Sequence, residues 1–314
     1  MGRLVEAAPA KINLALEVGG LRPDGYHDIH SVMQSLDLRD TIILEDRPAG
    51  VSLTCLTGDP LDQGALAYMG SDPGYMPPSD CRNIAWQAAE LLMEATGIKR
   101  GLHIVLRKVI PVSAGLGGGS ADAAAVLRGL NQAWNLGLTM EELVTIGARV
   151  GADVPFCLLG GTAEVKGIGE HVVPLPAAPS WPVILVNPPV GVSTAVCYSE
   201  YDRLLQPVSV DVDAMVAALA AEDLQQVATH LGNSLETVTF TQLPSLARVK
   251  VTLVECGCIG VMMSGSGPTF FGLVNDVDHG DKVFAKLKAA LKQEPLDEMP
   301  NVYLTRFRST PEVV

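Results

Sequence analysis

Hydrophobic residues in the first half of the chain follow two spacings, one typical of strands and one typical of helices. Short runs of β-branched and other apolar residues predict β-strands at 11–18, 30–46, 51–56 and 102–108. Apolar residues recur at helical spacing over 82–97 and 121–134. Thr139 and Glu142 have the spacing of a capping box, which predicts a further helix that ends at Gly151. We therefore expect a mixed β and α domain in this half.

The second half, from about residue 161, has a different order of elements. Apolar runs predict strands at 182–188, 259–265, 268–274 and 301–307, and helical spacing predicts helices at 212–231, 244–257 and 282–293. This order is that of a split βαβ, ferredoxin-like sandwich. We expect an α+β protein of two domains, residues 1–160 and 161–314, with ligands in the cleft between them. The segment 57–80, rich in Gly, Pro and Asp, is predicted to be a long surface loop.

Composition and charge narrow the class of protein. The chain has 314 residues, 48% of them hydrophobic, and its net charge of −13 argues against a broad surface for nucleic acid or for a membrane. The N-terminal residues lack the apolar core of a secretory signal, and no apolar run approaches transmembrane length. The six cysteines form no Cys-x-x-Cys pair, which favours reduced thiols. We expect a cytoplasmic monomer or weak homodimer that acts on a small molecule.

Residues 111–131 read PVSAGLGGGSADAAAVLRGLN, a glycine-rich loop followed at once by a helical segment. Glycine lets a ligand approach the backbone closely, and a helix N-terminus offers unpaired N–H groups and the positive end of a dipole. A tight turn alone needs one or two glycines. Four of them, Gly115 and Gly117 to Gly119, lose backbone entropy on folding without adding packing. The loop therefore predicts a phosphate site rather than a purely structural turn.

Two common phosphate motifs do not fit this loop. A Walker A loop needs a lysine directly after its last glycine, and none follows here. The dinucleotide fingerprint needs a third glycine where this chain has Ser120, and a strand after the first helix, where a second helix is predicted. A nicotinamide cofactor is therefore disfavoured.

The pattern P-x-x-x-G-L-G-G-G-S-A-D resembles the phosphate loop of the GHMP kinases, the superfamily of galactose, homoserine, mevalonate and phosphomevalonate kinases. PAKINLALEV, residues 9–18, is similar to the first motif of that superfamily, and MSGSGPTFFGLV, residues 263–274, is similar to its third. All three occur in the right order across almost the whole chain. The resemblance implies the two-domain GHMP kinase fold and transfer of phosphate from ATP to an alcohol.

Two further segments, 22–42 and 151–170, resemble a narrower group of these kinases. Its members phosphorylate the tertiary hydroxyl of a branched sugar alcohol that carries a cytidyl diphosphate, in the non-mevalonate route to isoprenoid precursors. The discriminating pieces are Asp-Gly-Tyr-His at 24–27 and GADVPF at 151–156. One departure is NSLE at 233–236, where the group often has NDLE. The alternatives are a homoserine, mevalonate or sugar kinase of the superfamily and a non-catalytic relative that only binds its ligand.

The resemblance assigns Lys11 and Asp153 together as the catalytic pair. Lys11 lies among apolar and small residues, so it either pairs with a carboxylate near the reacting hydroxyl or reaches solvent from a strand edge. Asp153 is either an ordinary turn aspartate or a group that accepts the proton of the substrate hydroxyl, or only orients that hydroxyl.

The resemblance also predicts the residues that bind the phosphate acceptor. Tyr26 and His27 follow a turn, where they are either ordinary surface aromatics or rings that hold a nucleobase. In the resembling group this pair handles the cytosine ring, and Tyr198 is expected on its second face. Asn13 and Thr194 are predicted to contact the sugar-alcohol end.

By the same resemblance, ATP is the cofactor and its phosphates lie over the glycine loop. The predicted contacts are Pro111, Ala114, Gly115, Leu116, Gly117, Gly118, Gly119, Ser120 and Ala121, with Lys108 and Asn83 at the nucleotide base. Mg²⁺ is expected because phosphoryl transfer needs charge neutralised on the phosphates, and Ser120 is the candidate protein ligand. His27 and His30 have a spacing that a metal could use, but the sequence signals no third ligand, so we expect no zinc site there.

Overall fold

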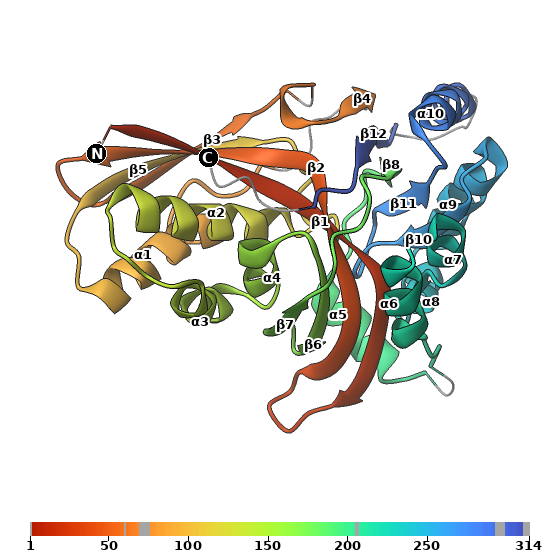
Figure 1. Cartoon of the computed structure of the whole chain (residues 1–314), viewed down its shortest axis with the longest axis horizontal. Coiled ribbons are helices and arrows are strands. Elements are labelled where there is room, and N and C mark those ends of the chain that lie inside the picture. Colours follow the sequence, from red (N-terminus) through yellow and green to blue (C-terminus); the bar gives the residue numbers. More distant parts are fainter. Residues whose placement is uncertain (1, 60, 69–75, 205–206, 293–298, 310–314) are drawn as a thin grey trace.

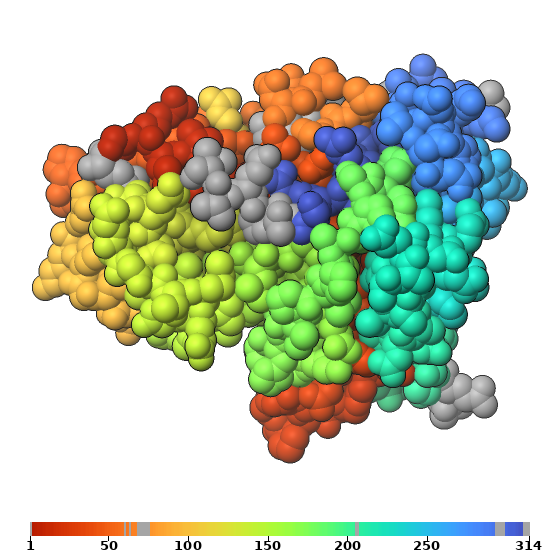
Figure 2. Space-filling view, in the orientation of Figure 1, coloured from red at the N-terminus to blue at the C-terminus, as the bar shows by residue number. Residues whose placement is uncertain are grey.

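The chain folds into two β-sheets flanked by helices, one sheet in each half of the molecule (Figure 1). The computed structural model describes residues 2–59, 61–68, 76–204, 207–292 and 299–309. The long strands β1 and β2 run from the first sheet toward the second half of the molecule, and the hairpin that joins them projects from its surface (Figure 2). No helix among these residues has the length and apolar character needed to cross a membrane.

The first sheet has the strand order β3-β5-β2-β1-β9, and β6 and β7 extend it from β2. Its strands are β1 (Arg3–Leu21), β2 (His27–Arg47), β3 (Val51–Thr57), β5 (Gly101–Lys108), β6 (Thr162–Gly167), β7 (His171–Pro174) and β9 (Gly232–Asn233). β1 and β2 pair antiparallel over nearly their whole length, from Arg3 opposite Glu45 to Leu21 opposite His27, with irregularities that include one between Pro9 and Lys11. The predicted strands of this half are confirmed, and each is longer than its apolar run.

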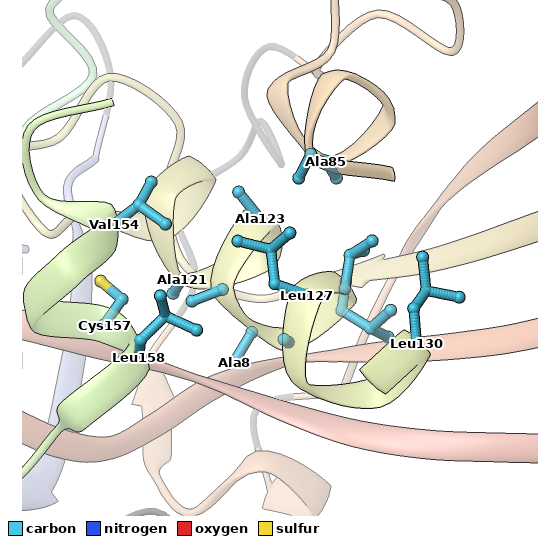
Figure 3. Packing of buried hydrophobic residues seen from close by; sticks show 14 of the residues in the cluster. Ala8, Ala85, Ala121, Ala123, Leu127, Leu130, Val154, Cys157 and Leu158 are labelled. Carbon is cyan, nitrogen blue, oxygen red and sulfur yellow. The ribbon is translucent and has the colours of Figure 1, made fainter. Parts of the chain in front are cut away.

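Three helices lie on one face of the first sheet, α1 (Ile84–Thr96), α2 (Gly118–Ala133) and α4 (Val154–Leu159), and α3 (Met140–Val150) packs against these helices. Helix α2 lies at the centre of this layer and packs through small side chains such as Ala121 and Ala123 (Figure 3). Small residues bring the helix close to the sheet, so that a Cβ on Gly129 would lie 2.6 Å from Leu44 Cδ1. The capping box of Thr139 is confirmed.

The second sheet has the order β10-β11-β8-β12-β4, and all its pairs are antiparallel. Its strands are β4 (Leu66–Tyr68), β8 (Pro182–Asn187), β10 (Gly260–Met263), β11 (Phe270–Leu273) and β12 (Asn301–Arg306). Its helices are α5 (Thr194–Tyr201), α6 (Val212–Ala220), α7 (Leu224–Thr229), α8 (Glu236–Gln242), α9 (Ser245–Cys256) and α10 (Val277–Leu291). Without β4, this order is that of the ferredoxin-like split βαβ, as predicted.

The structure corrects three of the predicted elements. Helix α2 begins at Gly118 rather than at Ala121, so two of the loop glycines belong to its first turn. The helix predicted over 212–231 is broken into α6 and α7, because Glu222 has a φ of 52° and Asp223 caps the second helix. The predicted loop 57–80 contains a 3₁₀ turn, Leu61–Gln63, and strand β4, while residues 60 and 69–75 lie outside the described part.

The two halves share strands and a core, so each sheet contains strands from before and after residue 160. β6, β7 and β9 come from the second half of the chain but complete the first sheet, and β4 comes from the first half but pairs with β12. One apolar cluster joins Ile12 and Leu14 of β1 to Leu185 and Phe271 of the second sheet. The division into 1–160 and 161–314 therefore stays a proposal about folding units.

Candidate active site

A cleft of about 990 Å³ opens between the two halves of the molecule. Its walls come from β1, from the hairpin between β1 and β2, from the glycine loop, from the start of α4 and from α5. The sequence-predicted residues that line it are Lys11, Asn13, Tyr26, His27, Asn83, Lys108, Pro111, Ala114, Gly115, Gly117, Gly118, Gly119, Ser120, Asp153, Thr194 and Tyr198. Of the predicted site residues, Leu116 and Ala121 are the exceptions, because both side chains are 1% exposed and belong to the core.

The glycine loop is held between β1 and the loop that follows β10. Gly115 and Gly117 have φ values of 77° and 66°, which L side chains rarely adopt. A Cβ on Gly115 would lie 2.1 Å from the carbonyl oxygen of Ser264, whose hydroxyl donates to the Gly115 carbonyl at 2.8 Å. The Lys11 N–H donates to the Leu116 carbonyl at 2.9 Å. These contacts join the three sequence motifs in space.

The N-terminus of α2 faces the cleft without a side-chain cap. Gly117 is the N-cap residue, and no side chain in the described part of the chain accepts from the first backbone N–H groups of the helix. Gly118, Gly119 and Ser120 line the cleft, and there is no acidic residue in this first turn. Unpaired N–H groups at the positive end of a helix dipole form an anion site. The predicted phosphate site therefore has the geometry that its chemistry needs.

Lys11 and Asp153 come together at the floor of the cleft. The Lys11 Nζ atom lies 3.4 Å from Asp153 Oδ2 and donates to Asn13 Oδ1 at 2.8 Å. Asn13 is oriented in turn, because its amide donates to the Ser31 hydroxyl at 3.0 Å. Asp153 occupies the N-cap position of α4 but accepts no capping hydrogen bond, so its carboxylate stays available to the cleft. A Cβ on Gly117 would lie 2.8 Å from Lys11 Cγ, so this glycine also makes room for the lysine.

The predicted base-binding residues line the same cleft, where the hairpin between β1 and β2 meets α5. His27 is 8% exposed, and its ring centroid lies 5.1 Å from that of Tyr198. Burial raises the pKa of the Tyr198 hydroxyl. Tyr26 is 58% exposed on the projecting hairpin, where its ring is open to a ligand. The Thr194 hydroxyl forms a 2.9 Å hydrogen bond with that of Ser266, in the third motif.

Two residues beside His27 were missed by the sequence reasoning. Asp202 Oδ1 lies 2.7 Å from His27 Nε2, and the Tyr201 ring contacts the His27 ring edge-on at 6.3 Å. Both residues follow Tyr198 on or after α5 but stand about 175 positions from His27 in the chain. No local signal marks them, because their role depends on a contact between distant segments.

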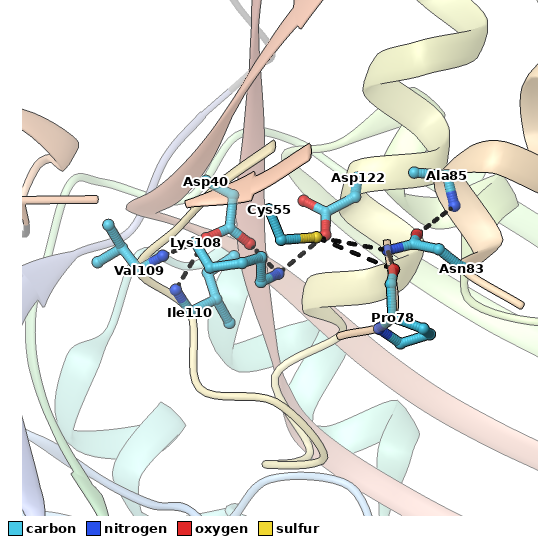
Figure 4. Close-up of polar contacts among 9 residues, drawn as sticks. All are labelled: Asp40, Cys55, Pro78, Asn83, Ala85, Lys108, Val109, Ile110 and Asp122. Atoms are coloured by element: carbon cyan, nitrogen blue, oxygen red, sulfur yellow. Dashed lines mark hydrogen bonds and ion pairs between the residues drawn. The ribbon is translucent and has the colours of Figure 1, made fainter. Parts of the chain in front are cut away.

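Lys108 and Asn83 line the cleft, but their polar atoms are engaged within the protein (Figure 4). Lys108 is buried between Asp40 and Asp122, and it contacts Asp122 Oδ2 at 2.8 Å. Burial lowers the pKa of the Lys108 ammonium, but the two carboxylates more than offset this and raise it above its ordinary value. Asn83 caps α1 by accepting from the Ala85 N–H at 2.9 Å. Contact of either residue with the nucleotide base stays a prediction.

His30, whose spacing from His27 a metal could use, has its own partners in the structure. His30 contacts Glu164 Oε1 at 2.7 Å, with a carboxylate oxygen of Asp213 within 4.8 Å of both groups. Lys166 also contacts this Glu164 oxygen, at 2.9 Å, so the carboxylate already has a cationic partner. No sequence motif predicts this grouping, because its three residues come from distant segments of the chain.

The NSLE departure is accommodated by the backbone around it. The Ser234 hydroxyl donates to the Val208 carbonyl at 3.0 Å and accepts from the Val18 N–H at 3.3 Å. The Asn233 amide donates to the carbonyls of Met263 and Gly265 at 2.8 and 2.7 Å. This segment therefore supports the third motif through Asn233, and its Leu235 lines the cleft.

Comparison with known proteins gives the same family at the level of sequence and of fold. The family model of the GHMP kinases N terminal domain matches residues 83–161, and that of the GHMP kinases C terminal matches residues 215–293. The 4-diphosphocytidyl-2-C-methyl-D-erythritol kinase of Geobacillus kaustophilus is 44% identical over 93% of this chain and 95% of its own length. The same kinase from Bacillus cytotoxicus is 45% identical over the same shares.

Solved structures agree with these relatives. A crystal structure of 4-(cytidine 5'-diphospho)-2C-methyl-D-erythritol kinase is 33% identical and has a TM-score of 0.73, covering 96% of this chain and 99% of that one. A homoserine kinase from Cytophaga hutchinsonii has a TM-score of 0.74 at 21% identity, covering 99% of this chain and 96% of that one, which shows the shared fold alone. The chain belongs to the GHMP kinases and, among them, to the 4-diphosphocytidyl-2-C-methyl-D-erythritol kinase family.

Proposed function

We propose that this protein transfers the γ-phosphoryl group of ATP to the tertiary hydroxyl of 4-diphosphocytidyl-2-C-methyl-D-erythritol, a step in the synthesis of isoprenoid precursors. As a GHMP kinase it is an ATP-dependent phosphotransferase with an alcohol as acceptor. The observation that carries the proposal is the Lys11–Asp153 pair, 3.4 Å apart, in the same cleft as the uncapped N-terminus of α2. The pair that could activate a hydroxyl and the helix N-terminus that could bind phosphate thus line the same cleft.

In the proposed reaction the hydroxyl oxygen of the substrate bonds to the γ-phosphorus, and the bond between that phosphorus and ADP breaks. Asp153 accepts the proton that the hydroxyl releases. Lys11 holds the carboxylate in place, and its own ammonium is fixed by Asn13. The N–H groups at the start of α2 hold the phosphates, where the helix dipole favours negative charge. Positioning and fixed electrostatics then supply most of the rate, because phosphoryl transfer needs little covalent chemistry from the protein.

Oxygen ligands for Mg²⁺ are available in the cleft, because the Ser120 hydroxyl and the Asp153 carboxylate both line it. We propose Ser120 as the protein ligand, and the ion when bound neutralises charge on the phosphates. The six cysteines are free thiols, which supports a cytoplasmic location. We propose a monomer or weak homodimer, which size-exclusion chromatography with light scattering would test.

A coupled assay of ADP release tests the proposed activity against its relatives in the superfamily. The panel is the cytidyl substrate, homoserine, mevalonate and galactose, each at the same concentration with saturating ATP. We expect turnover with the cytidyl substrate to exceed that with each of the others. Preference for an acceptor without a nucleobase would refute the cytidyl substrate while leaving a GHMP kinase.

Replacement of Tyr26 by Ala tests the base-binding end separately. It removes one stacking face, worth roughly 1–3 kcal/mol, which raises the KM for the cytidyl substrate about 5- to 150-fold. The KM for ATP should change little, because Tyr26 lies on the projecting hairpin. An acceptor that lacks the cytidine should be poor with the wild type and no worse with Tyr26→Ala. An equal loss with both acceptors would make Tyr26 a structural residue.

A further inference from the structure

The His27 ring is held by three residues of α5 and its C-terminus. Its centroid lies 5.1 Å from that of Tyr198 and 6.3 Å from that of Tyr201, and its Nε2 lies 2.7 Å from Asp202 Oδ1. Tyr201 is anchored in turn, since its hydroxyl donates to the Val18 carbonyl at 2.7 Å. With 8% of its surface exposed, His27 has little freedom to turn its ring.

The partner of Nε2 decides what the other ring nitrogen can do. A carboxylate only accepts hydrogen bonds, so Asp202 requires a hydrogen on Nε2. In the neutral ring Nδ1 is then a hydrogen-bond acceptor. Within the described residues no group bonds to Nδ1, and His27 and Asp202 both line the cleft. In its neutral form His27 therefore offers a ligand an acceptor rather than a donor.

We propose that Asp202 is a positioning residue that sets the tautomer of His27 and thereby makes the base end of the cleft select cytosine over uracil. Cytosine carries an exocyclic amino group where uracil carries a carbonyl oxygen. A fixed acceptor pairs with the amino hydrogen and repels the carbonyl oxygen, so only the cytidyl compound satisfies both partners. This inference rests on the proposed function, because it concerns how the same site reads the base of its substrate.

The test compares the cytidyl substrate with its uridyl counterpart, identical except for the base. For the wild type we expect kcat/KM to be lower with the uridyl compound by about 5- to 150-fold, the range for one buried polar group left without a partner. Asp202→Asn keeps the shape of the side chain, but its amide can donate to Nε2 and so releases the tautomer. In Asp202→Asn the ratio of kcat/KM for the cytidyl compound to that for the uridyl compound should fall toward one. The cause should be a higher KM for the cytidyl compound, with kcat and the KM for ATP little changed.

Glu200→Gln is the matched control. Glu200 is on the same helix, loses the same charge and pairs with Arg203 rather than with His27. This variant should keep the wild-type preference. ¹⁵N-detected NMR of the histidine rings, with the His27 signals assigned from His27→Gln, supplies a readout independent of activity. The wild type should show hydrogen on Nε2 alone, and Asp202→Asn should show both tautomers.

The inference would be overturned by a wild type that uses the uridyl compound equally well, by an Asp202→Asn variant that keeps the preference, or by a wild-type His27 with its hydrogen on Nδ1. An equal loss with both compounds in Asp202→Asn would make Asp202 structural and would also refute it. Failure of the wild type to phosphorylate either compound would instead refute the proposed function.

Discussion

Asp153 begins helix α4 without capping it, although an aspartate in that position ordinarily accepts from the first N–H groups of its helix. Its carboxylate lies 3.4 Å from Lys11 Nζ and is 29% exposed in the cleft. Lys11 is 5% exposed and so needs an oxygen partner, which Asn13 and Asp153 provide together. The three side chains form a unit in which the lysine orders the carboxylate.

The Asp153→Asn variant keeps this shape and removes the charge. We expect kcat to fall by about two orders of magnitude or more, the usual size of a lost general base. The nucleotide affinity should change little, because the phosphate site is built from the backbone of the glycine loop and α2. Steady-state kinetics and nucleotide titration check this pair of outcomes. Turnover equal to the wild type would exclude a catalytic role for Asp153.

The glycine loop acts as one element with α2 and with strand β1. Gly117 combines a φ of 66° with close contact to the Lys11 side chain, so a methyl group there strains the loop and displaces the lysine. We expect Gly117→Ala to lower kcat on the order of 100-fold, the size of effect that misplacement of reacting groups by about 1 Å can produce. Kinetics on the purified variant give the measurement.

Gly97→Ala separates backbone strain from displacement of the lysine. Gly97 has a similar φ of 70° at the C-terminus of α1, and a Cβ there would meet no atom within 4 Å. Both variants should lose about 1–2 kcal/mol of stability from the left-handed conformation. Only Gly117→Ala should lose turnover, and equal kinetics in the two variants would contradict the contact with Lys11.

Lys108 joins three elements, because its partners are Asp40 on β2 and Asp122 on α2 while it lies on β5. Asp40 also accepts from the backbone N–H groups of Val109 and Ile110, at the entrance to the glycine loop. Burial raises the pKa of Asp122 well above its ordinary value, and the Lys108 ammonium opposes this rise. The cluster therefore holds α2 and the loop against the sheet.

Lys108→Met leaves two buried carboxylates without their cation. We expect a loss of about 3–5 kcal/mol in the free energy of unfolding, measured by urea denaturation. Lys166→Met is the control, because Lys166 is half exposed and its pair with Glu164 is worth at most about 1 kcal/mol. Similar losses in the two variants would show that the buried cluster adds no special stability.

At the scale of the whole molecule, the two halves share too much core to unfold independently. Ile12 and Leu14 on β1 are fully buried against residues such as Leu185 of the second sheet, and β4 and β9 each pair in the sheet of the other half. We expect calorimetry to show one unfolding transition. ATP should raise the midpoint of that transition as a whole, because it binds only the native state. Two separate transitions would favour independent domains.

Interactions between residues close in the sequence determined most of the secondary structure of this protein. The capping box of Thr139 and most helices and strands depend on neighbouring residues and were predicted correctly, although α2 begins three residues earlier than predicted and the helix predicted over 212–231 is broken in two. Ordered motifs likewise predicted the family and identified Lys11 and Asp153, which the fold brings together. Backbone preferences and short-range hydrogen bonds act within a few residues, so a single sequence carries them directly.

Only the tertiary structure decided which distant groups meet. The pairing of His27 with Asp202, the burial of Lys108 between two carboxylates, and the position of β4 beside β12 carry no local signal. Lys108 was predicted to contact the nucleotide base, but its charge is already paired inside the protein. Such contacts follow from strand register and from the packing of α2 and α5 against the sheets. Because register and packing are settled by the whole core at once, no short stretch of sequence specifies them.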